Sequence, residues 1–253
     1  MSQIEICENH TGKMEGLKSI STAVTVNPFC QANQQKNGSI CQKCYAQMML
    51  NKMYKALDEK CKRNTALLTS RVLEDYELPD LSKEKYFRFE SFGDLNNAIQ
   101  LQNYVNIAKR NPNTMFALWT KQYQLAYAFF TKYDVPDNFT LILSSLMVNQ
   151  KISIDNFKQL VKPSGFGYNF KPGQLKVFTV YDENYISKNP KAVNINCGSK
   201  LCMGCLQCYN QTNNEEINEV VKSEQSDVYR LLEQYDSRFI KESVSVLDDL
   251  NNL

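Results

Sequence analysis

The chain has 253 residues, of which 43% are hydrophobic and 22% are charged, and its formal net charge is +2. These values are typical of a folded protein with one large domain or two small ones, and they give no indication of nucleic-acid binding. No run of roughly 18 apolar residues occurs, which excludes a predicted membrane span. The N-terminus carries Glu5 and Glu8 and lacks the apolar core of a signal peptide, so we expect a cytoplasmic protein.

The N-terminal part of the chain is expected to contain a strand, a polar loop and a long helix. Residues 19–26 (SISTAVTV) are rich in β-branched side chains and end at an Asn-Pro pair, which predicts a strand. Residues 31–39 are polar, which predicts a loop between Cys30 and Cys41. Over residues 44–68, apolar side chains recur at spacings of three and four, which predicts a helix.

After residue 80, short apolar runs alternate with helical patterns, and turn signals separate them. Strands are predicted at residues 86–89, 115–119, 139–143 and 175–181, helices at residues 97–109, 122–132 and 154–161, and a glycine-containing loop at residues 163–173. Such alternation is typical of parallel βαβ units. We therefore expect an α/β fold whose parallel strands form either a partial (β/α) barrel or an open sheet.

The C-terminal part differs in composition, and we expect three regions in all. These are an α/β domain over residues 1–190, a cysteine-rich metal-binding segment over residues 191–212, and a C-terminal helix within residues 213–253. The helix is predicted because residues 215–239 carry one apolar stripe at helical spacing. An amphipathic helix of this kind packs on its own domain or forms the contact surface for a protein partner.

Seven of the nine cysteines form two groups with the spacing of metal ligands. The groups are Cys30, Cys41 and Cys44, and Cys197, Cys202, Cys205 and Cys208. Iron–sulfur clusters suit both, because the second group has a ferredoxin-type spacing and a four-iron cluster held by three thiolates keeps one iron free. Zinc suits the second group as well, but at the first group it would need a fourth ligand such as His10, Cys7 or Cys61. Disulfides are the third alternative, which the absence of an export signal disfavours.

Polar residues follow each predicted strand, at the position where parallel α/β proteins bind their ligands. The first cysteine group follows the first strand, and the later strands are followed by Glu90, Ser91, Gly93, Asp94, Thr120, Lys121, Ser144, Ser145, Asp182 and Glu183. Because the carboxyl ends of parallel strands share one edge, we expect these residues to line a single rim. Residues 90–94 have an alternative interpretation as a strand end with a turn and a helix cap, and Lys121 as an ordinary solvated lysine.

Several short segments resemble, in order, the phage gene product 88-like family. They are residues 38–46 (GSICQKCYA), 87–94 (FRFESFGD), 104–108 (YVNIA), 116–121 (FALWTK) and the terminal Cys202-x2-Cys205-x2-Cys208-Tyr209 pattern. The layout is also similar to that of radical S-adenosylmethionine (SAM) enzymes. That resemblance implies that Cys30, Cys41 and Cys44 hold a [4Fe–4S] cluster, with Tyr45 as the aromatic residue beside the last ligand. It further implies that residues 90–94 bind the methionyl amine of SAM and that the second cysteine group holds an auxiliary cluster.

Two hypotheses of function follow. In the first, the three-cysteine cluster binds SAM and starts radical chemistry on a small-molecule or peptide substrate that the sequence does not identify, with Lys121 and Ser144 as further contacts. In the second, both cysteine groups are structural zinc or iron–sulfur sites in a non-enzymatic protein that binds a partner through its C-terminal helix. If the chain is phage-encoded, either protein is expected to act in the host cytoplasm.

Overall fold

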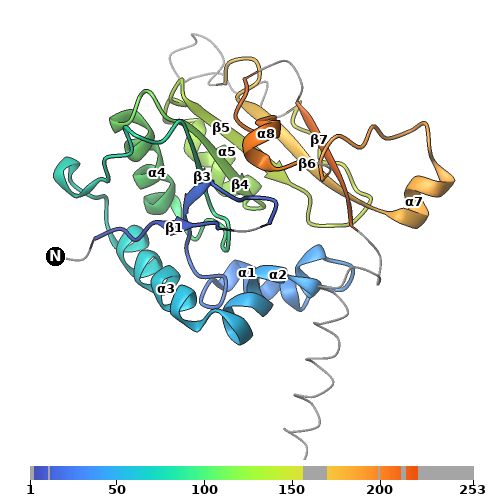
Figure 1. Cartoon of the computed structure of the whole chain (residues 1–253), viewed down its shortest axis with the longest axis horizontal. Helices are drawn as coiled ribbons and strands as arrows, with labels where there is room; N and C mark the ends of the chain where they lie inside the picture. Colours follow the sequence, from blue (N-terminus) through green and yellow to red (C-terminus); the bar gives the residue numbers. More distant parts are fainter. Residues whose placement is uncertain (1–2, 11, 156–169, 199, 212–214, 222–253) are drawn as a thin grey trace, which may run out of the picture.

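The centre of the molecule is a sheet of seven strands, and the computed structural model describes residues 3–10, 12–155, 170–198, 200–211 and 215–221 (Figure 1). The strands are β1 (Cys7–Glu8), β2 (Lys18–Ile20), β3 (Tyr86–Phe89), β4 (Met115–Thr120), β5 (Phe139–Ser144), β6 (Leu175–Asp182) and β7 (Glu216–Val221). They lie in the sheet in the same order as in the chain. β1 is antiparallel to β2, and each later strand is parallel to the one before it. The predicted α/β class with parallel strands is therefore confirmed.

Helices occupy most of the connections between consecutive strands. They are α1 (Pro28–Gln34), η1 (Ile40–Lys43), α2 (Tyr45–Met48), η2 (Met49–Met53), α3 (Lys55–Ser70), η3 (Asp75–Glu77), α4 (Ala98–Arg110), α5 (Tyr123–Phe130), α7 (Glu183–Lys188) and α8 (Cys202–Cys205). The helices and strands predicted between residues 86 and 144 agree with the observed ones to within two residues at each end. The predicted helix at 154–161 and most of the loop at 163–173 lie outside the described residues.

Two predicted elements near the N-terminus are shorter or broken. The strand expected over residues 19–26 ends at Ile20, because the backbone groups that follow bond to side chains instead of to a neighbouring strand. The Thr22 N–H, for example, donates to the Glu90 carboxylate at 3.1 Å. The helix expected over residues 44–68 is divided into α2, the π-helical turn η2 and α3, and the break lies at Tyr54, whose φ and ψ are −125° and 58°.

One face of the sheet forms the main hydrophobic core. Phe87, Phe89, Phe116 and Leu118 are fully buried on this face, among apolar residues of α3, α4 and α5. The Phe89 ring stacks on Tyr104 of α4 with 4.2 Å between the ring centroids. Burial of an aromatic or aliphatic side chain of this size stabilises a fold by roughly 1.5–3 kcal/mol, so this face supplies the rigid base of the molecule.

The opposite face of the sheet is covered by the cysteine-rich segment instead of by helices α3 to α5. Leu17, Ala117, Ile142 and Ile217 form a second apolar cluster with Tyr209, which directly follows the last cysteine. The alternation of side chains along each strand produces both faces, since neighbouring residues point in opposite directions. The four-cysteine group is therefore packed against the sheet (Figure 1).

The region expected to form a C-terminal helix begins with a strand. Residues 216–221 form β7, which pairs in parallel with β6 from Val177↔Glu216 to Asp182↔Val221. The helical prediction for these six residues is wrong, because Ile217, Val220 and Val221 suit a β-strand as well as a helix and the exposed edge of β6 accepts them. The rest of the expected helix, residues 222–253, lies outside the described part of the chain. No helix among the described residues is long and apolar enough to cross a membrane.

Candidate metal centres

The segment that follows β2 carries the first cysteine group. Asn27 fixes the start of α1, the first helix of this segment. The Asn27 side chain caps α1 by accepting hydrogen bonds from the N–H groups of Phe29 and Cys30, at 3.0 and 3.3 Å. Its amide nitrogen donates to the backbone carbonyl of Asp94 at 2.9 Å. Cys30 is therefore held in the first turn of α1, and this turn is tied to the loop after β3.

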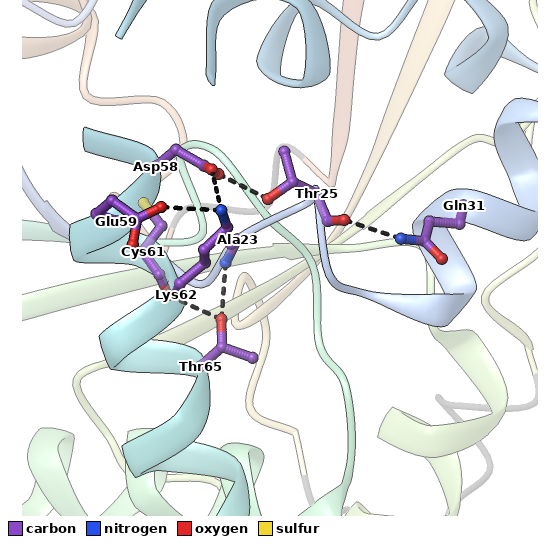
Figure 2. Close-up of polar contacts among 8 residues, drawn as sticks. All are labelled: Ala23, Thr25, Gln31, Asp58, Glu59, Cys61, Lys62 and Thr65. Carbon is purple, nitrogen blue, oxygen red and sulfur yellow. Dashed lines mark hydrogen bonds and ion pairs between the residues drawn. The ribbon is translucent and has the colours of Figure 1, made fainter. Parts of the chain in front are cut away.

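A second set of hydrogen bonds holds the same loop against α3 (Figure 2). The Ala23 N–H donates to the Thr65 hydroxyl at 2.9 Å, and the Thr25 hydroxyl donates to the Asp58 carboxylate at 2.6 Å. Gln31 of α1 donates to the Thr25 carbonyl at 2.8 Å. These bonds join α1 to α3 through the loop, so the position of Cys30 depends on both helices.

Cys41 and Cys44 return to the same place after the polar loop. Ser39 accepts a hydrogen bond from the Cys41 N–H at 3.1 Å, and Cys44 immediately precedes α2. Cys30 and Cys44 belong to one apolar cluster. Burial raises the pKa of the Cys30 thiol far above its usual range, and the nearby charges of Asp94, Cys44 and Cys41 act in the same direction. The structure therefore brings the three thiols into one neighbourhood at the carboxyl end of β2.

Glu90, at the end of β3, is turned into the protein and away from the rim. Its backbone φ is 62°, and the residue is only 2% exposed. The carboxylate accepts hydrogen bonds from the Tyr104 hydroxyl, the Gln100 amide at 2.6 Å, and both the N–H and hydroxyl of Thr22 at 3.1 and 3.0 Å. Three of these donors bond to Oε1 and the Thr22 N–H bonds to Oε2, so both oxygens are held inside the protein. Burial raises the pKa of Glu90 to about 8, although the Tyr104 and Thr22 donors oppose the shift.

Gly93 is required by the close packing around Glu90. A Cβ atom at this position would lie 2.4 Å from a Glu90 carboxylate oxygen, 2.4 Å from the Thr22 carbonyl and 2.7 Å from the Thr22 hydroxyl. No side chain fits there without moving the loop. The glycine of this motif is thus explained by packing, and the alternative interpretation of residues 90–94 as a structural strand end accounts for both Glu90 and Gly93.

Asp94 has a different position, near the first cysteine group, where its charge raises the pKa of the Cys30 and Cys41 thiols. Its carboxylate accepts hydrogen bonds from the Thr120 hydroxyl at 2.5 Å, the Leu95 N–H at 2.8 Å and the Lys121 N–H at 3.0 Å. Burial raises the pKa of Asp94, while the Lys121 charge lowers it. Among the described residues Oδ2 accepts one hydrogen bond, from the Lys121 N–H, so this oxygen has room for a further donor.

Tyr45, Ser91 and Ser144 lie around the same edge of the sheet. The Tyr45 hydroxyl donates to the Ser91 carbonyl at 2.7 Å, and the residue is 44% exposed. The Ser91 hydroxyl is buried and has no hydrogen-bond partner among the described residues. The Ser144 carbonyl accepts a hydrogen bond from the Tyr123 hydroxyl. Asp182, at the end of β6, caps α7 through the Tyr185 N–H, which gives it a structural role.

The four cysteines of the second group line a cavity of about 300 Å³. Backbone hydrogen bonds fix the segment at two points, from Cys197 N–H to the Asn218 carbonyl at 3.0 Å and from Cys202 N–H to the Lys13 carbonyl at 2.8 Å. Fully buried Lys176 of β6 donates to the carbonyls of Gln207 and Asn210, both at 2.8 Å. The cavity therefore lies between the sheet and a segment that β6, β7 and the loop before β2 hold in place.

Positive side chains surround this second group. The Lys13 ammonium donates to the Cys197 sulfur at 3.1 Å and also pairs with Glu219. Burial raises the pKa of the Cys208 thiol to about 12, and the charge of Arg88 opposes this shift. Arg88, Trp119 and Tyr209 line the cavity beside the cysteines. Sequence reasoning missed Lys13 and Arg88, although the alternation of β3 places Arg88 on the face opposite Phe87 and Phe89.

The two remaining cysteines and the histidine do not complete either group. Cys7 and Cys61 are buried next to each other, and a side-chain hydrogen bond from Cys61 lowers the pKa of Cys7. His10 has a side chain that is 80% exposed and lies 3.9 Å from Glu8. Among the described residues, no group of three or more His, Cys, Asp or Glu side chains is arranged so that it could hold a metal ion.

Comparison with known proteins identifies the family. No curated protein and no solved structure matches the chain. A family model described as gene product 88, a phage-type family, matches residues 8–163. The matched region contains the first cysteine group and the ends of strands β2 to β5, and it stops before the four-cysteine segment. Because the match covers more than half of the chain, the protein belongs to the gene product 88 family.

Proposed function

We propose that this protein is an iron–sulfur protein of the radical SAM type. Cys30, Cys41 and Cys44 would hold a [4Fe–4S] cluster that binds SAM, and Cys197, Cys202, Cys205 and Cys208 would hold an auxiliary cluster. The observation that carries the proposal is the division of seven cysteines between two places on one sheet. Three lie at the carboxyl end of the first parallel strand, and four line a cavity on the face without α3 to α5. The sequential order of parallel strands supports a partial barrel as the framework.

The residues around the first group suit a cluster with one open iron. Three thiols share the site, and both other cysteines are buried against each other, which leaves no fourth thiol in the group. When bound, the cluster and SAM would supply the one-electron chemistry, and the protein supplies binding and orientation. Asp94 contributes an open acceptor position for an amine donor, while the Glu90 carboxylate, already occupied by four donors, supports the loop. The Lys121 charge lowers the pKa of Asp94 and Cys41, which favours their charged forms.

The cavity at the second group favours a cluster over a single zinc ion. Zinc binds four thiolates at about 2.3 Å, so its ligands close around it without further space. A volume of about 300 Å³ between the cysteines and the sheet suits a group of several atoms instead. Lys13 and Arg88 supply positive charge beside the thiols, which stabilises the negative charge of a metal–thiolate centre.

The proposal is tested on protein purified without oxygen, by metal and sulfide analysis, absorption spectroscopy and titration with SAM. We expect iron, acid-labile sulfide and a brown colour. Cys41→Ala should abolish SAM binding while keeping the iron of the second site, and Cys205→Ala should lose that iron while keeping SAM binding. Cys61→Ala serves as the matched control, because Cys61 belongs to neither group, and it should keep both properties.

A colourless protein that contains zinc and has no affinity for SAM would contradict the proposal. That result would favour the second hypothesis, in which the cysteines hold structural metal ions in a partner-binding protein. The surface for such a partner was expected on the C-terminal helix, whose residues 222–253 lie outside the described part. The substrate of the proposed enzyme is a small molecule or peptide that would enter at the rim beside Tyr45 and Lys121.

A further inference from the structure

Two residues that line the four-cysteine cavity each carry a buried hydrogen-bond donor that has no partner within the described part of the chain. They are Nε of Arg88 and the hydroxyl of Tyr209, and both residues line the cavity together with the four cysteines. A buried donor without a partner costs about 1–3 kcal/mol, so a folded protein rarely keeps two of them in one cavity without a ligand that uses them. The pair therefore points to an acceptor that the cavity is shaped to receive.

The side chains that carry these two donors are both held by other contacts. The Arg88 guanidinium lies over the Trp119 ring, with 4.0 Å from its central carbon to the ring centroid. Its two terminal nitrogens donate to the Met14 sulfur at 3.0 Å and the Glu90 carbonyl at 3.4 Å. The Tyr209 ring packs against Trp119 and Tyr86, with centroid distances of 6.4 and 5.4 Å. Both donors are thus held in place before any ligand binds.

The chemistry of the cavity identifies the acceptor as sulfur. The Glu219 carboxylate near the cavity already pairs with Lys13. Arg88 and Tyr209 line the same cavity as Cys202 and Cys208, and Tyr209 directly follows Cys208 in the chain, so the thiols are acceptors available in the same cavity. Thiolate and sulfide sulfurs accept N–H and O–H hydrogen bonds, and such bonds help to set the reduction potential of an iron–sulfur cluster.

We propose that Arg88 and Tyr209 donate hydrogen bonds to the sulfur atoms of the centre held by Cys197, Cys202, Cys205 and Cys208, and that they raise its reduction potential. The inference rests on the proposed function, because it requires a redox-active cluster at this site. Reduction adds negative charge to the cluster, and a nearby positive charge and two donors stabilise that charge. Arg88 and Tyr209 are positioning residues in this view, since the four cysteines alone bind the metal.

Tyr209→Phe is the sharpest test, because it removes the hydroxyl and leaves the ring packing in place. Tyr86→Phe is the matched control, since the Tyr86 ring packs against Tyr209 but does not line the cavity. Each full-length protein is prepared without oxygen, its iron content is measured, and the potential is determined by a redox titration followed by electron paramagnetic resonance. The signal of the second site is identified by its loss in Cys205→Ala.

We expect Tyr209→Phe to keep the iron content and to lower the potential of the second site, with Arg88→Gln lowering it further and Tyr86→Phe leaving it unchanged. If the wild-type protein holds iron at the second site and Tyr209→Phe has the same potential as Tyr86→Phe, the inference is overturned and the proposed function stands. If the wild-type second site holds no iron, both are overturned. A potential that is lowered in Tyr209→Phe and unchanged in Tyr86→Phe supports both the inference and the proposed function.

Discussion

Replacing Gly93 with alanine tests whether the polar junction around Glu90 is as tightly packed as the structure indicates. The new methyl group would lie 2.4 Å from both the Glu90 carboxylate and the Thr22 carbonyl, which is closer than Cβ atoms approach any neighbour in real proteins. Neither neighbour can move freely. Glu90 is held by four hydrogen bonds, and the Thr22 carbonyl belongs to the backbone.

The size of the effect follows from this crowding. Overpacking of a rigid site costs typically 1–3 kcal/mol, and the displaced carboxylate would also lose part of its hydrogen bonding, so we expect a loss of about 3 kcal/mol. For a chain of this length that corresponds to a decrease of roughly 6–12 °C in the melting temperature. Thermal and urea unfolding, followed by circular dichroism, measure both quantities.

Gly204→Ala is the matched control for this substitution. A Cβ atom at Gly204 would have no neighbour within 4 Å, and the residue lies in α8, so its stability should change by less than about 1 kcal/mol. If Gly93→Ala is as stable as Gly204→Ala, the Glu90 junction yields easily, and the explanation of Gly93 as a packing requirement is refuted.

Three further predictions concern the residues that support the two cysteine groups. Burial raises the pKa of Glu90 from 4.5 to about 8, so as the pH rises the carboxyl group ionises in the unfolded state before it ionises in the folded state. Between pH 4.5 and 8 the free energy of unfolding should therefore fall relative to that of Glu90→Gln, by up to about 1.4 kcal/mol per pH unit. Parallel curves of stability against pH for the two proteins would contradict this. Lys176→Met should lower the free energy of unfolding by about 2 kcal/mol and reduce the metal content of the second site, because two carbonyls of the cysteine-rich segment lose their donor. The control Lys171→Met, at an exposed lysine, should change neither quantity. Asn27→Ala removes the cap of α1, so it should lower the free energy of unfolding by roughly 1–2 kcal/mol and reduce the metal content of the first site alone. Loss of metal from both sites would argue against this local role.

The sequence predicted most of the sheet but could not assign its two edges. The alternation of short apolar runs with helical patterns placed β3 to β6 correctly, because buried parallel strands and amphipathic helices leave clear periods. β1 has only two residues, which is too short for any periodic signal. β7 was missed because Ile217, Val220 and Val221 fit both periods, and only the unpaired edge of β6 decides between strand and helix.

The candidate site was predictable to the extent that it depends on spacing. Cysteine spacing indicated two groups, and the strand order placed the first at the carboxyl end of β2. The role of Glu90 could not be read in this way, because it depends on a backbone φ of 62° and on Gln100 and Tyr104, which α4 brings from elsewhere in the chain. The cavity also escaped prediction, since it forms only when the cysteine-rich segment packs against Arg88 on the far face of β3.

The short strand β3 connects the two cysteine groups physically. Phe87 and Phe89 point into the core, Arg88 points into the four-cysteine cavity, and Glu90 ends the strand inside the junction that supports the three-cysteine loop. A terminal nitrogen of Arg88 also donates to the Glu90 carbonyl, so a change at Arg88 acts on both places. Tyr209 has no such contact with the junction in the described structure. Arg88→Gln and Tyr209→Phe should therefore both change the second centre locally. Only Arg88→Gln should also change the first centre, through the Glu90 junction.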